Sequence, residues 1–151
     1  PETRRRVLAS LSLRDGEDVE DVAWTDNGPG WISVLCRSAQ VVLACRPGAI
    51  EHDIGLIGRY APEDRSECAF EVRGMWPGRG GGFVEEAGTG SLNGAAAEWL
   101  IATGRAPQTP YLVSQGTCIG RRGRIRIDSA EGKVWVGGDV HFVVHGGSVT
   151  L

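Results

Sequence analysis

Residues 85–91, Glu-Glu-Ala-Gly-Thr-Gly-Ser, run directly into Leu-Asn-Gly-Ala-Ala-Ala-Glu-Trp-Leu-Ile-Ala at residues 92–102. The second segment is apolar on nearly every side of a helix, and a helix of that kind is buried. Gly104 suits the left-handed position that follows a helix, and Pro107 prevents continuation. These residues predict one buried helix with the rest of the chain packed around it.

The start of this helix carries the residues that point to chemistry. Thr89, Gly90 and Ser91 place hydroxyl groups and an approachable backbone where the first amides of a helix lack intrahelical partners. Such an end attracts anions, so these residues are candidates for binding a substrate carboxylate. Glu86 lies just outside and is the candidate acid or base, with Glu85 as its competitor. The alternative is that the segment only starts a core helix and that both glutamates are solvated charges.

Outside this helix the pattern is mostly that of β-strands separated by turns rich in glycine and proline. Residues 40–44 are apolar enough for a strand covered on both faces. Paired glycines at 146–147 predict a hairpin between residues 139–145 and 148–151, and residues 1–11 predict an amphipathic helix. Many strands around one apolar helix indicate an α+β domain. The other expected strands lie at residues 22–24, 31–35, 54–60, 68–76, 111–114, 124–128 and 133–136.

Length and composition indicate a single soluble domain that spans residues 1–151. A net charge of −3 gives no electrostatic reason to expect a nucleic-acid partner. No apolar run approaches the ~20 residues of a membrane helix, and no signal-peptide pattern is present, so the expected location is cytoplasmic, away from membranes. The four cysteines lie far apart and contain no C-x-x-C pair, which predicts free thiols, with disulfides as the alternative.

Two further patterns resemble sites. Asp139, His141 and His145 alternate along one expected strand and would share a face. Residues four apart on a strand are separated by roughly 13 Å, which is too far for one ion, so no metal site is predicted. Residues 77–82, Pro-Gly-Arg-Gly-Gly-Gly, lack the P-loop pattern and suggest a mobile flap beside the substrate cleft or an ordinary surface loop.

Residues 85–91 resemble the Glu-Asp-Pro-Ala-Thr-Gly-Ser motif of the phenazine-biosynthesis (PhzF-like) isomerase family, which shares the diaminopimelate epimerase-like fold. The resemblance implies mixed and antiparallel strands wrapped around one central buried helix. Further segments that look like family landmarks follow in the family's order, namely Asn-Gly-Pro-Gly-Trp at 27–31, Val-Arg-Gly-Met-Trp-Pro at 72–77, Gln-Gly-Thr at 115–117 with Ile-Gly-Arg at 119–121, and Val-Trp-Val-Gly-Gly at 134–138.

The resemblance also implies a function. Family members are about twice as long, with two similar domains and an active site in the cleft between them, and this chain resembles only the second. We therefore expect half of a cofactor-independent isomerase or epimerase that transfers a proton on a small carboxylate-bearing metabolite in biosynthesis. Its partner would be an N-terminal PhzF-like domain in the same or a separate chain. Glu86 occupies the position of the motif's aspartate, Ala87-Gly88 replaces Pro-Ala, and Gln115 and Gly116 could line the cleft.

The isolated chain is accordingly expected to be catalytically inert. An alternative from another class is a non-catalytic binding or assembly module. Such a module would form a homodimer through the face that an N-terminal domain would cover, because an uncovered interdomain face is an apolar patch.

Overall fold

The computed structural model describes residues 2–143 and Gly146. The predicted α+β class is confirmed, and the predicted apolar helix is present as α3. In chain order the elements are α1 (Glu2–Ser10), β1 (Val19–Asp26), β2 (Gly30–Cys36), α2 (Ala39–Ala44), β3 (Ile54–Arg59), β4 (Phe70–Pro77), β5 (Phe83–Glu86), α3 (Gly90–Ala102), β6 (Tyr111–Gln115), β7 (Gly123–Ala130) and β8 (Lys133–Gly137), with short 3-10 turns at Pro62–Asp64 and Thr117–Ile119.

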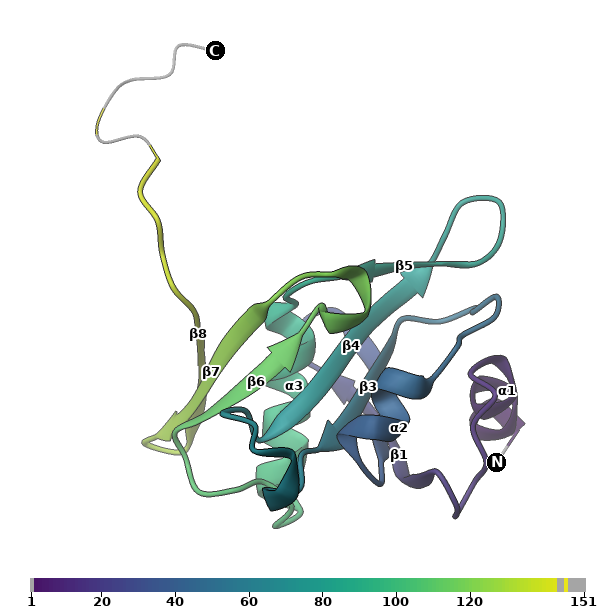
Figure 1. The fold of residues 1–151 in the computed structure, drawn as a ribbon, viewed down its shortest axis with the longest axis horizontal. Helices are drawn as coiled ribbons and strands as arrows, with labels where there is room; N and C mark the ends of the chain where they lie inside the picture. The colour runs from purple at the N-terminus through teal and green to yellow at the C-terminus, as the bar shows by residue number, and fades with distance from the viewer. Residues whose placement is uncertain (1, 144–145, 147–151) are drawn as a thin grey trace.

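The strands form one mixed sheet that curls around α3 (Figure 1). Seven of them follow the order β1-β2-β3-β4-β6-β7-β8, and β5 pairs with β4 beside them. The β2–β3 and β4–β6 pairs are parallel and the others are antiparallel. α3 contacts β1 and β2 near one end of this order and β7 and β8 at the other. Both ends of the sheet therefore reach the same central helix.

α3 fits inside the curled sheet because its own side chains are mostly small and the facing strands carry glycine at points of close approach. At Gly55 of β3, an added Cβ would lie 2.2 Å from Leu92 Cδ1, and Leu92 itself is fully buried. The helix ends as predicted, with Gly104 at φ 67°. The buried residues of α3 are Leu92, Asn93, Gly94, Ala95, Ala96, Ala97 and Leu100.

The opposite face of the sheet holds a second core, beneath α1 and α2. Val7 and Leu8 of α1, with Val42 of α2, pack there against side chains of β2, β3 and β4. The side chain of Ser38 caps α2 by accepting a hydrogen bond from the backbone N–H of Val41. The amphipathic N-terminal helix is confirmed over Glu2–Ser10, while residue 1 lies outside the described residues.

The prediction of a strand at residues 40–44 is wrong, because Ala39–Ala44 is a helix. β2 and β3 pair in parallel, and parallel neighbours need a crossover connection that packs on a sheet face. α2 lies in that connection, with Val42 fully buried. Within residues 40–44 only Val42 is buried, so the expected cover on both faces is wrong as well. The four apolar residues after Gln40 are too few to distinguish a strand from a helical turn.

The predicted C-terminal hairpin is also wrong over its described part. β8 ends at Gly137, and Gly138 to Val143 form no strand. Val140 and Val143 are largely exposed there, and the segment leads away from the sheet in Figure 1. The rest of that hairpin, residues 144–145 and 147–151, lies outside the described residues. Within the described chain, no helix is long and apolar enough to cross a membrane.

The burial of two thiols, Cys36 and Cys45, predicts that the stability of this fold depends on pH. Burial raises the pKa of Cys36 to about 12 and that of Cys45 to about 11. In the unfolded chain these thiols ionise at their ordinary value of 9.0, so between pH 9 and about 11 the unfolded state binds fewer protons. The free energy of unfolding should therefore fall through that window, by at most ~1.4 kcal/mol per pH unit per thiol.

Urea unfolding of the chain at successive pH values measures this slope. Cys45→Ala should remove about half of the contribution that Cys36 and Cys45 make together. If the double variant Cys36→Ala/Cys45→Ala keeps the wild-type slope, the two thiols are not its source.

Candidate functional site

The candidate site lies where β5 and β6 meet end to end along one edge of β4. β6 runs parallel to β4 and ends at Gln115, opposite Val72. β5 runs antiparallel and ends at Glu86, opposite Gly74. The two strand ends are linked by a hydrogen bond of 3.0 Å from Gln115 Nε2 to the backbone carbonyl of Glu86. Since α3 begins four residues after Glu86, its start lies at this junction.

A buried hydrogen-bonded network connects the predicted site residues. Gln115 Oε1 accepts from the backbone N–H of Thr89 at 3.1 Å and from Asn93 Nδ2 at 2.8 Å. Gln115 Nε2 also donates to Thr89 Oγ1 at 2.9 Å. Thr89 Oγ1 in turn donates to Glu86 Oε2 at 3.0 Å. Gln115, Thr89 and Asn93 are buried, whereas Glu86 is exposed. The buried network therefore holds one oxygen, Oε2, of a carboxylate on an exposed residue.

The first turn of α3 has no side-chain cap. Thr89 is the N-cap, but its side chain makes no capping hydrogen bond because it is turned toward Glu86. Gly90 is exposed and Ser91 is half-buried. Among the described residues, the backbone N–H groups of Gly90 and Ser91 have no partner. These amides lie at the positive end of a 13-residue helix, an arrangement that favours anions.

Trp31 sets the direction of the Ser91 hydroxyl. The indole Nε1 of Trp31 donates to Ser91 Oγ at 3.3 Å, and Trp31 is buried. An indole N–H can only donate, so the Ser91 oxygen is the acceptor. The hydroxyl proton of Ser91 is therefore available to an acceptor outside the core. Nothing in the local sequence around Ser91 signals this contact, which joins residues 60 positions apart.

The structure separates the two adjacent glutamates. Successive side chains on a strand point to opposite faces, and Glu85 points into the core beneath α2. Its carboxylate accepts from Arg73 at 2.8 and 3.0 Å, and both side chains are only 4% exposed. Burial alone would lower the pKa of Arg73, but the hydrogen bonds and charge of Glu85 raise it above its ordinary value. Arg73 also donates to the carbonyls of Val42 and Cys45. Of the two candidates, only Glu86 lies at the helix start.

Gly116, a predicted site residue, and Gly123, which was not predicted, allow close approach between the turn that joins β6 to β7 and the motif loop, residues 87–89 between β5 and α3. Gly116 has φ 88°, and an added Cβ would lie 2.9 Å from Ala87 Cα. At Gly123, an added Cβ would lie 2.0 Å from the carbonyl oxygen of Ala87 and 2.7 Å from that of Gln115. These neighbours are backbone atoms, so the loop itself would have to move.

Gly123→Ala is therefore expected to destabilise the chain by about 3 kcal/mol, the upper end of the usual cost of overpacking. Thermal or urea unfolding measures the loss. Gly137→Ala is the matched control, because Gly137 also lies in a strand but an added Cβ meets nothing within 4 Å. Equal stability of the two variants would mean that the loop is not held closely by this turn.

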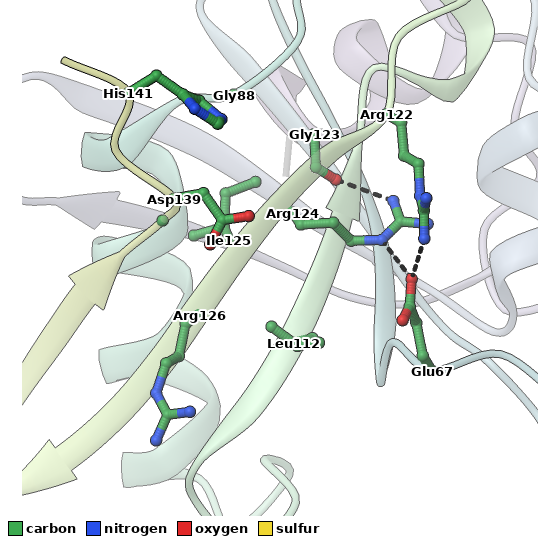
Figure 2. Close-up of a pocket in the computed structure, with 11 residues that line it drawn as sticks. Glu67, Gly88, Leu112, Arg122, Gly123, Arg124, Ile125, Arg126, Asp139 and His141 are labelled. Carbon is green, nitrogen blue, oxygen red and sulfur yellow. Dashed lines mark hydrogen bonds and ion pairs between the residues drawn. The ribbon is translucent and has the colours of Figure 1, made fainter.

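An open groove of about 810 Å³ lies beside the motif loop (Figure 2). Arg122 and Arg124 donate to Glu67, which lowers the pKa of that carboxyl. Asp139 and His141 face the groove from the C-terminal segment, while His145 lies outside the described residues. The described chain holds no group of three side chains suited to a metal ion. The groove is lined by Glu67, Gly88, Leu112, Arg122, Gly123, Arg124, Ile125, Arg126, Gly138, Asp139 and His141.

The glycine-rich loop does not adjoin the helix start. It connects β4 to β5 at the end of β5 opposite to Glu86, and it projects beyond the sheet in Figure 1. Gly80, Gly81 and Gly82 all have positive φ. Residues 77–82 therefore form a projecting hairpin loop, which β5 separates from the helix start, and this favours the surface-loop alternative over a flap beside that site.

Comparison with known proteins identifies the fold. No protein-family model and no curated protein matches the chain. The crystal structure of the Bacillus anthracis phenazine biosynthesis protein of the PhzF family matches with a TM-score of 0.65 at 14% identity, covering 87% of this chain and 49% of that one. A predicted epimerase from Pseudomonas aeruginosa matches with a TM-score of 0.62 at 19% identity, covering 95% and 53%. The chain therefore has a PhzF-like, diaminopimelate epimerase-like fold and spans about half the length of these two structures.

Proposed function

We propose that this chain is the second half of a cofactor-independent isomerase or epimerase that transfers a proton on a small carboxylate-bearing metabolite. The observation that carries the proposal is the pairing of Glu86 with an open helix start. One carboxylate oxygen of Glu86 is held by Thr89, and the unpartnered amides of Gly90 and Ser91 lie in the turn that follows. A fixed base beside an anion site is the arrangement that proton transfer next to a carboxylate requires.

In this mechanism the substrate carboxylate would bind at the start of α3. The N–H groups of Gly90 and Ser91 would donate to the substrate carboxylate oxygens. The Ser91 hydroxyl would be a third donor, because Ser91 Oγ already accepts a hydrogen bond from Trp31 and its proton is free to point at the substrate. Glu86 would then accept a proton from the substrate carbon, with the electron pair of the broken C–H bond moving toward the bound carboxylate. A second acid would return a proton at another position or on the opposite face.

That second acid is proposed to come from a partner half. The chain spans 49% and 53% of the two solved structures that share its fold. Glu85, the other acid in the motif, is paired with Arg73 in the core, so of the two motif glutamates Glu86 is the candidate acid at the helix start. The isolated chain is therefore expected to be inert.

The test is intact-mass measurement of the protein as its source organism makes it, followed by an assay of that protein and of the 151-residue chain side by side. The proposal expects a mass near twice the 16.1 kDa of this chain, or a tightly bound second subunit, and proton transfer only when both halves are present. Robust isomerisation by the 151-residue chain alone would overturn the two-half mechanism.

A second candidate is a non-catalytic module that forms a homodimer. It is favoured by exposed apolar side chains on β8 and the segment after it, where Trp135 is 60% exposed and Val140 is 75% exposed. Apolar side chains mark an interaction surface where they form a contiguous exposed patch. Sedimentation equilibrium distinguishes the two candidates: a stable dimer of an unprocessed 16.1 kDa chain without isomerase activity would favour the module.

A further inference from the structure

Gln115 is fully buried and uses every hydrogen-bonding position of its side chain. Its oxygen accepts from the Thr89 backbone N–H and from Asn93 Nδ2. Its nitrogen donates to the Glu86 carbonyl and to Thr89 Oγ1. A carboxamide offers two N–H donors and two good acceptor positions on its oxygen, so Gln115 has no donor or acceptor position left for a further partner.

Two backbone groups determine which way this carboxamide faces. The Glu86 carbonyl can only accept and the Thr89 N–H can only donate. Turning the carboxamide over would place its oxygen against the carbonyl and its NH2 group against the N–H, which removes both hydrogen bonds. The second proton of Gln115 Nε2 therefore has to point at Thr89 Oγ1, 2.9 Å away.

This direction determines the role of Thr89. Since its oxygen accepts from Gln115, its own proton must point elsewhere, and Glu86 Oε2 lies 3.0 Å away as the acceptor. Within the described residues, Glu86 Oε1 has no hydrogen-bond partner. The hydroxyl therefore holds one carboxylate oxygen and leaves the other to face a substrate.

We propose that Gln115 is a positioning residue, which acts through Thr89 to hold the Glu86 carboxylate in one orientation. Asn93 supports it from inside α3, donating to both Gln115 Oε1 and the Thr89 carbonyl. The consequence for catalysis rests on the function proposed above. The hydrogen-bond directions do not depend on it, so they can be tested separately.

The direct test uses NMR of the 151-residue chain and needs no reaction. Both side-chain amide protons of Gln115 should exchange slowly with water, and the Thr89 hydroxyl proton should be visible. Glu86→Gln should shift the Thr89 hydroxyl signal strongly, because the charged acceptor is lost, and leave the Gln115 side-chain signals nearly in place. A Thr89 hydroxyl that exchanges as fast as in free threonine, or that ignores Glu86→Gln, would overturn the proposal.

The kinetic test uses the full-length protein and a double-mutant cycle. Thr89→Val and Gln115→Met should each lower kcat by roughly 10- to 100-fold with little change in KM, since a misplaced base costs about this much. Thr89→Ser, which keeps the hydroxyl, should have a kcat close to that of the wild-type protein. The double variant Thr89→Val/Gln115→Met should be no slower than the slower of the two single variants. Losses that multiply in the double variant would contradict action through Thr89. If the wild-type protein transfers no proton while the NMR result holds, the proposed function fails and the hydrogen-bond arrangement stands.

Discussion

Under the proposed function, Glu86→Gln in the protein with both halves should lower kcat by roughly 100- to 10,000-fold, the usual contribution of a general acid or base. The substitution keeps the size of the side chain and an acceptor for the Thr89 hydroxyl, 3.0 Å from Oε2, but removes the base. Because Gly90 and Ser91 are proposed to bind the substrate, KM should change little. Steady-state kinetics measures both quantities.

Glu98→Gln is the matched control for this variant. Glu98 is also an exposed glutamate and lies on α3 itself, so its substitution makes the same change in net charge. It should leave kcat within a factor of about two. A Glu86→Gln variant as active as the control would remove Glu86 from the mechanism.

Arg73→Met should destabilise the chain by about 3–5 kcal/mol, the cost of leaving one partner of a buried ion pair uncompensated. Both side chains of the Arg73–Glu85 pair are 4% exposed. The substitution would also remove the donor to the carbonyls of Val42 and Cys45 at the end of α2. Urea unfolding measures the change in the free energy of unfolding.

Two further variants make this prediction specific. Arg73→Met/Glu85→Met removes both charges and should recover much of the loss. Arg5→Met breaks an ion pair with Glu2 whose side chains are 75% and 67% exposed, and such surface pairs contribute about 0–1 kcal/mol. If Arg73→Met costs no more than Arg5→Met, the pair does not stabilise the fold and Glu85 regains its candidacy as an acid.

Much of the fold could be predicted from the sequence because its strongest signal is local. The apolar run at residues 92–102 could only be a buried helix, and Gly104 marks its end with φ 67°. The helix at Ala39–Ala44 could not be predicted in the same way. Its six residues are too few for periodicity to separate a helix from a strand, and the deciding constraint is the parallel pairing of β2 with β3.

The candidate site likewise contains residues that local sequence predicts and residues whose roles depend on the fold. Glu86, Thr89 and Ser91 are close in sequence, so the helix start could be predicted from them. The roles of Asn93 and Trp31 depend on contacts that only the fold creates, such as the 3.3 Å hydrogen bond from Trp31 to Ser91. Nor does the sequence separate two adjacent glutamates. Only the structure shows that Glu85 lies in the core, where it accepts a hydrogen bond from Arg73, 12 residues away in the sequence.

Deuterium incorporation from heavy water into small carboxylates would reveal directly whether Glu86 transfers a proton. The full-length protein would be incubated with a panel of 2-substituted carboxylic acids and the products followed by NMR. At least one acid should gain deuterium next to its carboxylate, Glu86→Gln should abolish the gain, and Glu98→Gln should not. Deuterium incorporation that persists unchanged in Glu86→Gln, or none by the full-length protein with any acid of the panel, would contradict proton transfer by Glu86.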